Sequence, residues 1–178
     1  MWSSPLFWIL VAVMVFWALG AYNRLVRLRA AVQAADTQWQ EVLRRWVQMS
    51  QAWRVAAPVQ AADLADGAAL AVNERLEHAS QVLEAALVAA QARGGERLPS
   101  HPEWDACRAL LAAWADMLAN AGGPEGAEMA PWRAQAADLQ AVTTIAARNA
   151  EDAMQAYQAA IGQFPASVLA QVCGFGPR

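Results

Sequence analysis

The first 23 residues stand apart from the rest of the chain because none of them carries a charged side chain. Within them, Pro5 to Tyr22 reads PLFWILVAVMVFWALGAY. As a helix these residues extend roughly 27 Å, close to the ~30 Å hydrocarbon core of a bilayer. Trp8, Trp17 and Tyr22 lie towards the ends, where amphipathic rings favour the membrane interface. The pattern predicts a transmembrane anchor over residues 1–23.

Three arginines, Arg24, Arg27 and Arg29, follow the apolar stretch directly, and no basic side chain precedes it. The positive-inside rule then places the flank after the anchor in the cytoplasm. An anchor of the opposite orientation, with the domain outside, is the alternative. A cleaved signal peptide is a second alternative, with Ala18-Leu19-Gly20 as a weak cleavage site. The helical pattern runs through Gly20 without a break, which favours a retained anchor.

A heptad pattern follows the anchor for four repeats and predicts a helix that packs along another helix. No helix stop occurs before Pro58, so this helix is expected to be continuous with the anchor. The apolar positions are Leu25, Leu28, Val32, Ala35, Trp39, Val42, Trp46, Met49 and Trp53. Trp39, Trp46 and Trp53 are spaced by seven residues and share one line of the helix. This stripe indicates core packing, with a ligand-binding groove as the alternative.

Three further amphipathic helices are predicted. One runs from about Gln60 to Arg93 and ends at Gly94-Gly95. The next begins after Ser100 as N-cap, with Glu103 completing a capping box. The last has Pro131 in its first turn and runs to about Gln163. Each helix has a line of apolar positions along one side. In the first of the three the line is Val72, Leu76, Ala79, Leu83, Ala86 and Ala90. In the second it is Trp104, Cys107, Leu111, Trp114 and Leu118, and in the third it is Leu139, Val142, Ala146, Ala153, Tyr157 and Ile161.

The predicted fold is all-α. Alanine supplies 44 of the 178 residues, and because alanine is the best helix former a β-rich fold is excluded. Four helices joined by short loops predict an elongated antiparallel up-and-down four-helix bundle over residues 24–163, with the N-terminal transmembrane helix continuous with its first helix. In the tail, residues 164–178, the apolar side chains of Phe164, Pro165 and Phe175 are expected to fold back on the bundle. Docking on the membrane or on a partner is the alternative.

Charge is distributed unevenly along the chain, whose net charge is -3. Residues 22–60 carry six arginines and two acids, a balance of +4, whereas residues 61–178 carry seven arginines and 14 acids, a balance of -7. The basic stretch lies beside the predicted membrane, where arginines attract anionic lipid. Packing of a basic helix among acidic ones is the simpler interpretation, and both can hold. The acidic total does not favour a nucleic-acid partner.

No side chains have the spacing of a catalytic or metal site. His78 is four residues from Glu74, whereas the di-iron motif requires three. His101 lies in a linker, and the two cysteines, Cys107 and Cys173, are far apart. Phosphate-loop, dinucleotide-binding, zinc-protease and serine-hydrolase motifs are missing from the sequence. We expect no catalytic residue, no cofactor and no metal, and a protein that is not an enzyme.

Two stretches of the chain resemble the bacterial LemA family, in which a short N-terminal membrane segment precedes a helical domain. The first opens with AYNRLVRLR and continues to a basic pair; its matching residues are Tyr22, Asn23, Leu25, Val26, Arg29, Val32, Trp39, Leu43, Arg44 and Arg45. The second is the closing segment, with Ala147, Arg148, Asn149, Ala153, Tyr157, Ala160, Ile161, Phe164, Pro165, Ala170, Gly174, Phe175 and Pro177. The middle of the chain departs from the family pattern, so the chain resembles a divergent member.

The resemblance implies a helical bundle with one membrane anchor and an undefined biochemical role. The expected function is that of a membrane-anchored, non-enzymatic helical scaffold or interaction protein. Its expected partners are the lipid bilayer and either a protein or a second copy of the chain. The expected location is the bacterial inner membrane, crossed once, with the helical domain in the cytoplasm. The alternative function is a membrane-tethered ligand- or lipid-sensing module that uses a Trp-lined groove.

Overall fold

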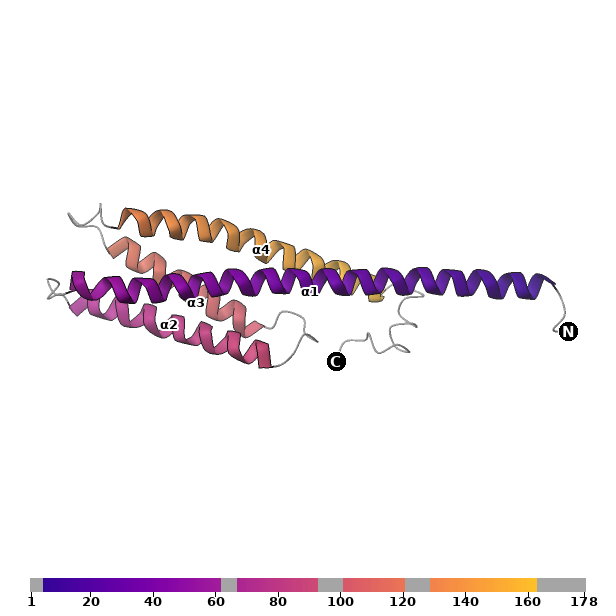
Figure 1. Ribbon diagram of the computed structural model, residues 1–178, viewed down its shortest axis with the longest axis horizontal. Coiled ribbons are helices and arrows are strands. Elements are labelled where there is room, and N and C mark those ends of the chain that lie inside the picture. Colours follow the sequence, from indigo (N-terminus) through magenta and orange to yellow (C-terminus); the bar gives the residue numbers. More distant parts are fainter. Residues whose placement is uncertain (1–4, 62–66, 93–100, 121–128, 163–178) are drawn as a thin grey trace. The chain divides into compact units, whose positions relative to one another are not determined.

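A computed structural model describes residues 5–61, 67–92, 101–120 and 129–162, and these ranges contain helices and no strand. The helices are α1 (Pro5–Ala61), α2 (Gly67–Ala92), α3 (His101–Asn120) and α4 (Ala130–Gly162) (Figure 1). The prediction of an all-α chain is confirmed for this part of the protein.

Helix α1 continues through Gly20 and joins the apolar stretch to the heptad stretch in one helix, as predicted. It also passes Pro58, so Gln60 and Ala61 are its last residues and do not begin the next helix as we expected. A proline removes its own amide donor, here the bond that would reach the carbonyl of Arg54, and its ring crowds that carbonyl. The helix ends three residues later, at Ala61. Helix α2 accordingly begins at Gly67.

The other helix ends agree with the sequence pattern where they are described. Pro131 lies in the first turn of α4, where its missing N–H costs nothing. Helix α2 ends at Ala92, just before the two glycines expected to stop it. Ser100, Gly94 and Gly95 lie outside the described residues.

The chain divides into two compact units. The first comprises Met1–Ala35 and Asn149–Arg178, and its buried apolar side chains are Leu25 and Val32 of α1 and Ala150 and Ala160 of α4. The second comprises Asp36–Arg148 and contains one continuous apolar core to which all four helices contribute. Its largest fully buried side chains are Trp39, Leu43, Trp46, Met49, Leu83, Leu110 and Trp114.

The predicted apolar lines of α1, α2 and α3 are confirmed, because every position in them is buried or half-buried. Helix α4 requires one correction. Val142 was expected to face the core, but its side chain is 38% exposed. The buried neighbour is Thr143, whose hydroxyl forms two hydrogen bonds inside the second unit. A polar residue at an inward position breaks the apolar periodicity, so this one position of the line was predicted one residue too early, and the other positions are buried or half-buried.

Candidate functional site

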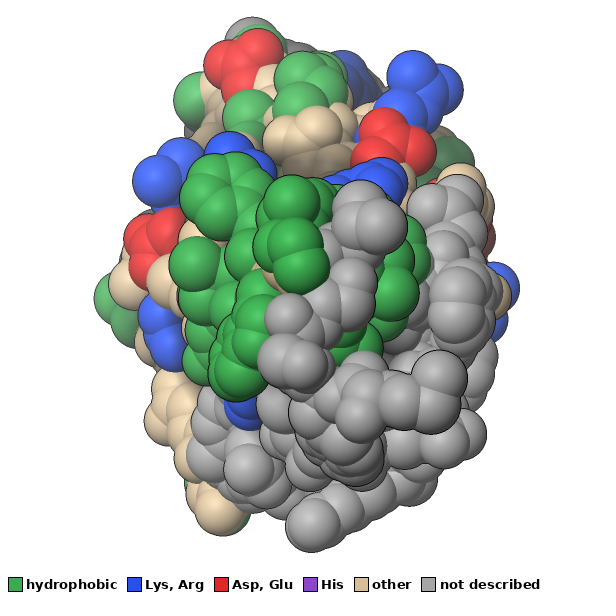
Figure 2. Space-filling view, turned by 90° about the vertical axis from the view of Figure 1, so that its right-hand side faces the viewer, with side chains coloured by type: hydrophobic (Ala, Val, Ile, Leu, Met, Phe, Trp, Pro, Cys, Tyr) green, Lys and Arg blue, Asp and Glu red, His purple; other side chains and the backbone are tan. Residues whose placement is uncertain are grey.

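The N-terminal part of α1 exposes its apolar side chains. Trp8 is 65% exposed and Phe16 is 81% exposed, and large apolar side chains with exposure above one third recur along the segment to Tyr22. Figure 2, in which the N-terminal end of α1 faces the viewer, shows hydrophobic side chains gathered there. Apolar surface costs about 25 cal/mol per Å² to keep in water, and a continuous exposed patch of this kind marks a membrane or protein contact.

Among the described residues, one helix is long and apolar enough to cross a membrane, and it lies near the N-terminus. That helix is α1, and its apolar stretch includes the predicted anchor residues Trp8, Trp17 and Tyr22. The predicted flanking arginines Arg24, Arg27 and Arg29 follow in the same helix, and all three are exposed. The structure therefore places the six predicted anchor residues on one continuous helix.

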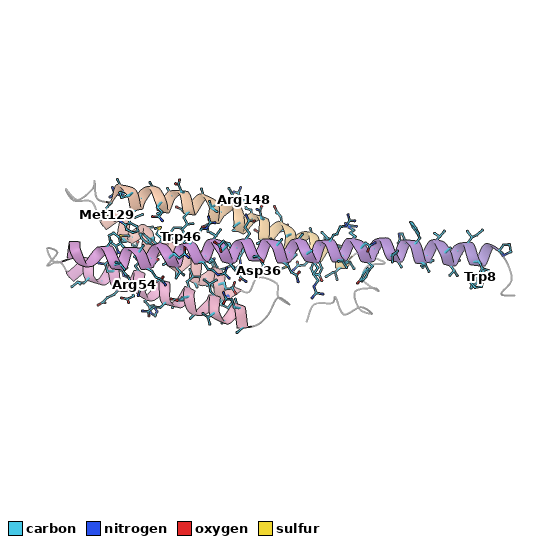
Figure 3. All side chains as sticks on the ribbon, viewed as in Figure 1. Trp8, Asp36, Trp46, Arg54, Met129 and Arg148 are labelled. Atoms are coloured by element: carbon cyan, nitrogen blue, oxygen red, sulfur yellow. The ribbon has the colours of Figure 1, made fainter. Side chains whose placement is uncertain are left out.

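The three predicted tryptophans of the heptad stripe are buried in the second unit. Figure 3 labels Trp46 on α1. Its indole N–H donates to the hydroxyl of Thr143 on α4, with an Nε1 to Oγ1 distance of 2.8 Å. That hydroxyl donates in turn to the carbonyl of Leu139, 2.7 Å away. The stripe thus serves packing between helices, which is the interpretation that the sequence favoured.

A second hydroxyl joins α1 to α3. Ser50 is buried and its hydroxyl donates to the carbonyl of Trp46 at 2.9 Å. The same oxygen accepts the indole N–H of Trp114, at 3.1 Å. Sequence reasoning missed both Ser50 and Thr143. The signal that could have found them is a small hydroxyl residue on the buried side of a helix, which can satisfy itself on the carbonyl one turn earlier and still accept a donor.

Trp53 ends the stripe among other aromatic rings. Its indole N–H donates to Oδ1 of Asn73 on α2, at 3.4 Å. Its ring packs edge-on against Trp132 of α4, with centroids 5.4 Å apart, and against Trp114, with centroids 6.2 Å apart. Edge-to-face pairs at these distances contribute about 0.5–1.5 kcal/mol beyond their buried area. Trp53, Trp114 and Trp132 therefore connect three helices at one level of the core.

Trp39 differs from the other two members of the stripe. Its ring stacks on Trp104 of α3, with centroids 4.7 Å apart and planes 22° from parallel. Its buried indole N–H has no hydrogen-bond acceptor within the described ranges. Leaving such a donor unpaired costs about 1–3 kcal/mol, so this position is the least satisfied polar group of the stripe.

Ion pairs on the surface of the second unit also link neighbouring helices. Arg54 of α1 pairs with Glu77 of α2 at 3.3 Å, and Arg75 of α2 pairs with Asp116 of α3 at 3.6 Å. Within α1, Glu41 forms ion pairs with both Arg44 and Arg45. All of these side chains are substantially exposed, so each pair contributes at most about 1 kcal/mol. The pair Arg54–Glu77 is of the kind expected for a basic helix packed among acidic ones.

Groups that could perform chemistry are dispersed. In the portions of the chain that the structure describes, no three side chains of His, Cys, Asp or Glu converge on a possible metal position. His78 and the carboxylates Glu74, Glu77 and Glu84 lie on the exposed side of α2. Cys107 is buried, and burial raises the pKa of its thiol from 9.0 to about 11. A thiol that stays protonated at neutral pH is a poor nucleophile.

The predicted tail contacts cannot be placed, because Phe164, Pro165 and Phe175 lie outside the described residues. The fold-back of the tail stays a prediction.

Comparison with known proteins gives no match: no family model, no curated protein and no solved structure matches the chain. The resemblance to the LemA family therefore stays a prediction that rests on the residues quoted for it.

Proposed function

We propose that the chain is a single-pass membrane-anchored helical module, resembling the LemA family, that works by contact with a protein partner or a second copy of itself and not by catalysis. The observation that carries this proposal is the exposed apolar segment at the start of α1, which is continuous with a helix whose other end is built into a packed core. Such a helix connects an apolar segment suited to a membrane with a helical unit that has its own packed core.

The anchor is supported by exposure and by charge. The apolar side chains between Phe7 and Tyr22 have little cover from the rest of the chain, unlike those of a core helix. Arginines follow at one end and no charge precedes them. By the positive-inside rule we propose that the second unit lies in the cytoplasm of a bacterial cell, below the inner membrane.

An antiparallel up-and-down bundle is supported by the order of contacts in the second unit. Along α1, Trp39 meets Trp104 and Trp46 meets Trp114, so α3 runs in the same direction as α1. Helix α4 runs the other way, because Trp46 meets Thr143 while Trp53 meets Trp132. In an up-and-down bundle the first and third helices are parallel, and the first and fourth are antiparallel.

A contact function is supported by how the second unit uses its side chains. Its interior is filled by indole rings and by hydroxyls that pair with them. Its surface retains isolated apolar side chains on α4, where Ile145 is 57% exposed one turn after the exposed Val142. These exposed positions are accessible to a partner, and they bear no reactive group.

Photocrosslinking in intact membranes tests the proposal. A photoreactive amino acid replaces Ile145 on α4 or Val88 on α2, both exposed in the described structure. We expect at least one position to give a discrete adduct, either with one other protein or with a second copy of the chain. The same variants diluted in detergent provide the control, in which the adduct disappears. Absence of a discrete adduct at both positions in membranes would contradict the proposal.

A ligand- or lipid-sensing module is the second candidate, and one observation favours it. Trp39 has a buried indole N–H without an acceptor in the described residues, and a molecule with an acceptor oxygen would satisfy it if the helices opened to admit that molecule. Titration of the full-length protein in detergent with acidic phospholipid, followed by tryptophan fluorescence, tests this function. A change that is absent from Trp39→Phe supports it, and an identical response of the two proteins contradicts it.

A further inference from the structure

Of the six arginines of α1, the three farthest from the N-terminus have acidic partners and two near the apolar segment do not. Arg44 and Arg45 pair with Glu41, and Arg54 pairs with Glu77. Arg24 and Arg27 are exposed and form no ion pair within the described part of the chain. The first acid of α1 is Asp36. The unbalanced positive charge of α1 is therefore concentrated next to its apolar stretch.

Helix geometry sets how far these charges lie from the apolar stretch. At 1.5 Å per residue, Arg24 lies about 3 Å beyond Tyr22 along the axis and Arg27 about 7.5 Å beyond it. The polar headgroup layer of a bilayer is roughly 5–7 Å deep on each side of the hydrocarbon core. Asp36, about 21 Å beyond Tyr22, lies well outside that layer. If the apolar stretch crosses the bilayer, Arg24 lies within the headgroup layer and Arg27 lies at its outer edge, where its long side chain can reach back to the headgroups.

The spacing of the two arginines also favours a counter-charge. Residues three apart on a helix are neighbours, and like charges at this spacing destabilise the helix by a few tenths of a kcal/mol. Glu41 pairs with both Arg44 and Arg45, but no acid lies within a helical turn of Arg24 or Arg27. A phosphate group fits two neighbouring guanidinium groups, because each can donate two parallel hydrogen bonds to its oxygens.

We propose that Arg24 and Arg27 form a binding site for the phosphate of an anionic phospholipid and so enrich that lipid around the end of the anchor. The proposal rests on the proposed function, because it requires the apolar segment of α1 to span the membrane. Anionic lipid is preferred over phosphatidylcholine, since the choline group of the latter neutralises its own phosphate. Arg29 is also exposed, but it lies about 10 Å beyond Tyr22, outside the headgroup layer.

A reporter for the lipid is already present in the helix. Trp17 precedes Arg24 by seven residues, so the two lie on nearly the same side of α1 and about 10 Å apart along its axis. A brominated acyl chain that is held at Arg24 would quench Trp17. The tryptophans of the second unit's core are buried or partly buried, which limits their contact with lipid. Trp17→Phe identifies the part of the signal that comes from this position.

The experiment uses the full-length protein in vesicles of phosphatidylcholine with a minor fraction of phosphatidylglycerol, brominated on one lipid or on the other. We expect brominated phosphatidylglycerol to quench Trp17 roughly two- to fivefold more, per molecule of lipid, than brominated phosphatidylcholine. The ratio should fall to about one in Arg24→Gln/Arg27→Gln and at high salt, because salt screens exposed charges. It should be unchanged in the matched control Arg44→Gln/Arg45→Gln.

The outcomes separate the lipid site from the anchor. Equal quenching by the two lipids, or a preference that survives in Arg24→Gln/Arg27→Gln, would overturn the lipid site and leave the anchor intact. Absence of quenching by either lipid would overturn the membrane span of the proposed function itself.

Discussion

The hydroxyl of Thr143 provides a defined test of how the core of the second unit is held together. Replacing Thr143 by valine keeps the side-chain shape and the helix propensity nearly constant while removing the oxygen that accepts the indole N–H of Trp46. The carbonyl of Leu139 loses the hydroxyl but keeps its backbone partner in the helix. The main cost is therefore one buried donor without an acceptor, which is about 1–3 kcal/mol.

Thr144 is a matched control in the same helix. Its hydroxyl makes the same bond to the carbonyl four residues earlier, at 3.0 Å to Gln140, but the residue is exposed and no indole contacts it. Thr144→Val should change the free energy of unfolding by less than about 0.5 kcal/mol. In urea unfolding of the full-length protein in mild detergent, followed by tryptophan fluorescence, a 2 kcal/mol loss lowers the midpoint by about 1 M. Equal midpoints for the two variants would refute the assigned role of Thr143.

Four further predictions concern the second unit. Leu83→Ala truncates a side chain that is 0% exposed and should lower the free energy of unfolding by about 2–5 kcal/mol in the same urea assay. A loss below about 1 kcal/mol would contradict the place of Leu83 in the core. Arg54→Gln breaks an exposed pair with Glu77, so it should cost less than about 1 kcal/mol, and a larger loss would show that the pair is not screened by water. Because burial raises the pKa of Cys107 to about 11, its thiolate fraction at pH 8 is roughly 100-fold lower than that of an exposed thiol. In a Cys173→Ser background, alkylation of Cys107 by iodoacetamide should therefore be slow until urea unfolds the protein. Rapid alkylation of the native protein would contradict the burial. The unfolded chain loses this proton near pH 9.0 and the folded chain near pH 11, so the stability that Cys107 contributes falls as the pH rises through that window, and Cys107→Ala should remove this dependence.

The helices and their buried sides could be predicted because they depend on local pattern. The repeat of apolar residues in α1 marks the buried side from Leu25 to Trp53, since a helix returns the same side inward every three or four residues. Pro131 marks the start of α4 for an equally local reason, because its missing N–H is harmless only in the first turn.

The polar contacts of the core could not be predicted, because they depend on which residues meet across helices. Thr143 and Trp46 are 97 residues apart, and nothing near either one in the sequence identifies the other. Glu103, which the sequence predicts to complete a capping box with Ser100, is buried, and its charge alone does not predict that position. The partner of each buried polar group follows from the three-dimensional packing.

The most direct test of the account is the fate of the apolar segment in cells that make the full-length protein. Membranes are washed with alkaline carbonate, and the protein in the membrane and soluble fractions is measured by intact mass. The account predicts a protein that stays in the membrane fraction and retains Pro5 to Tyr22. A soluble protein that has lost those residues would contradict it.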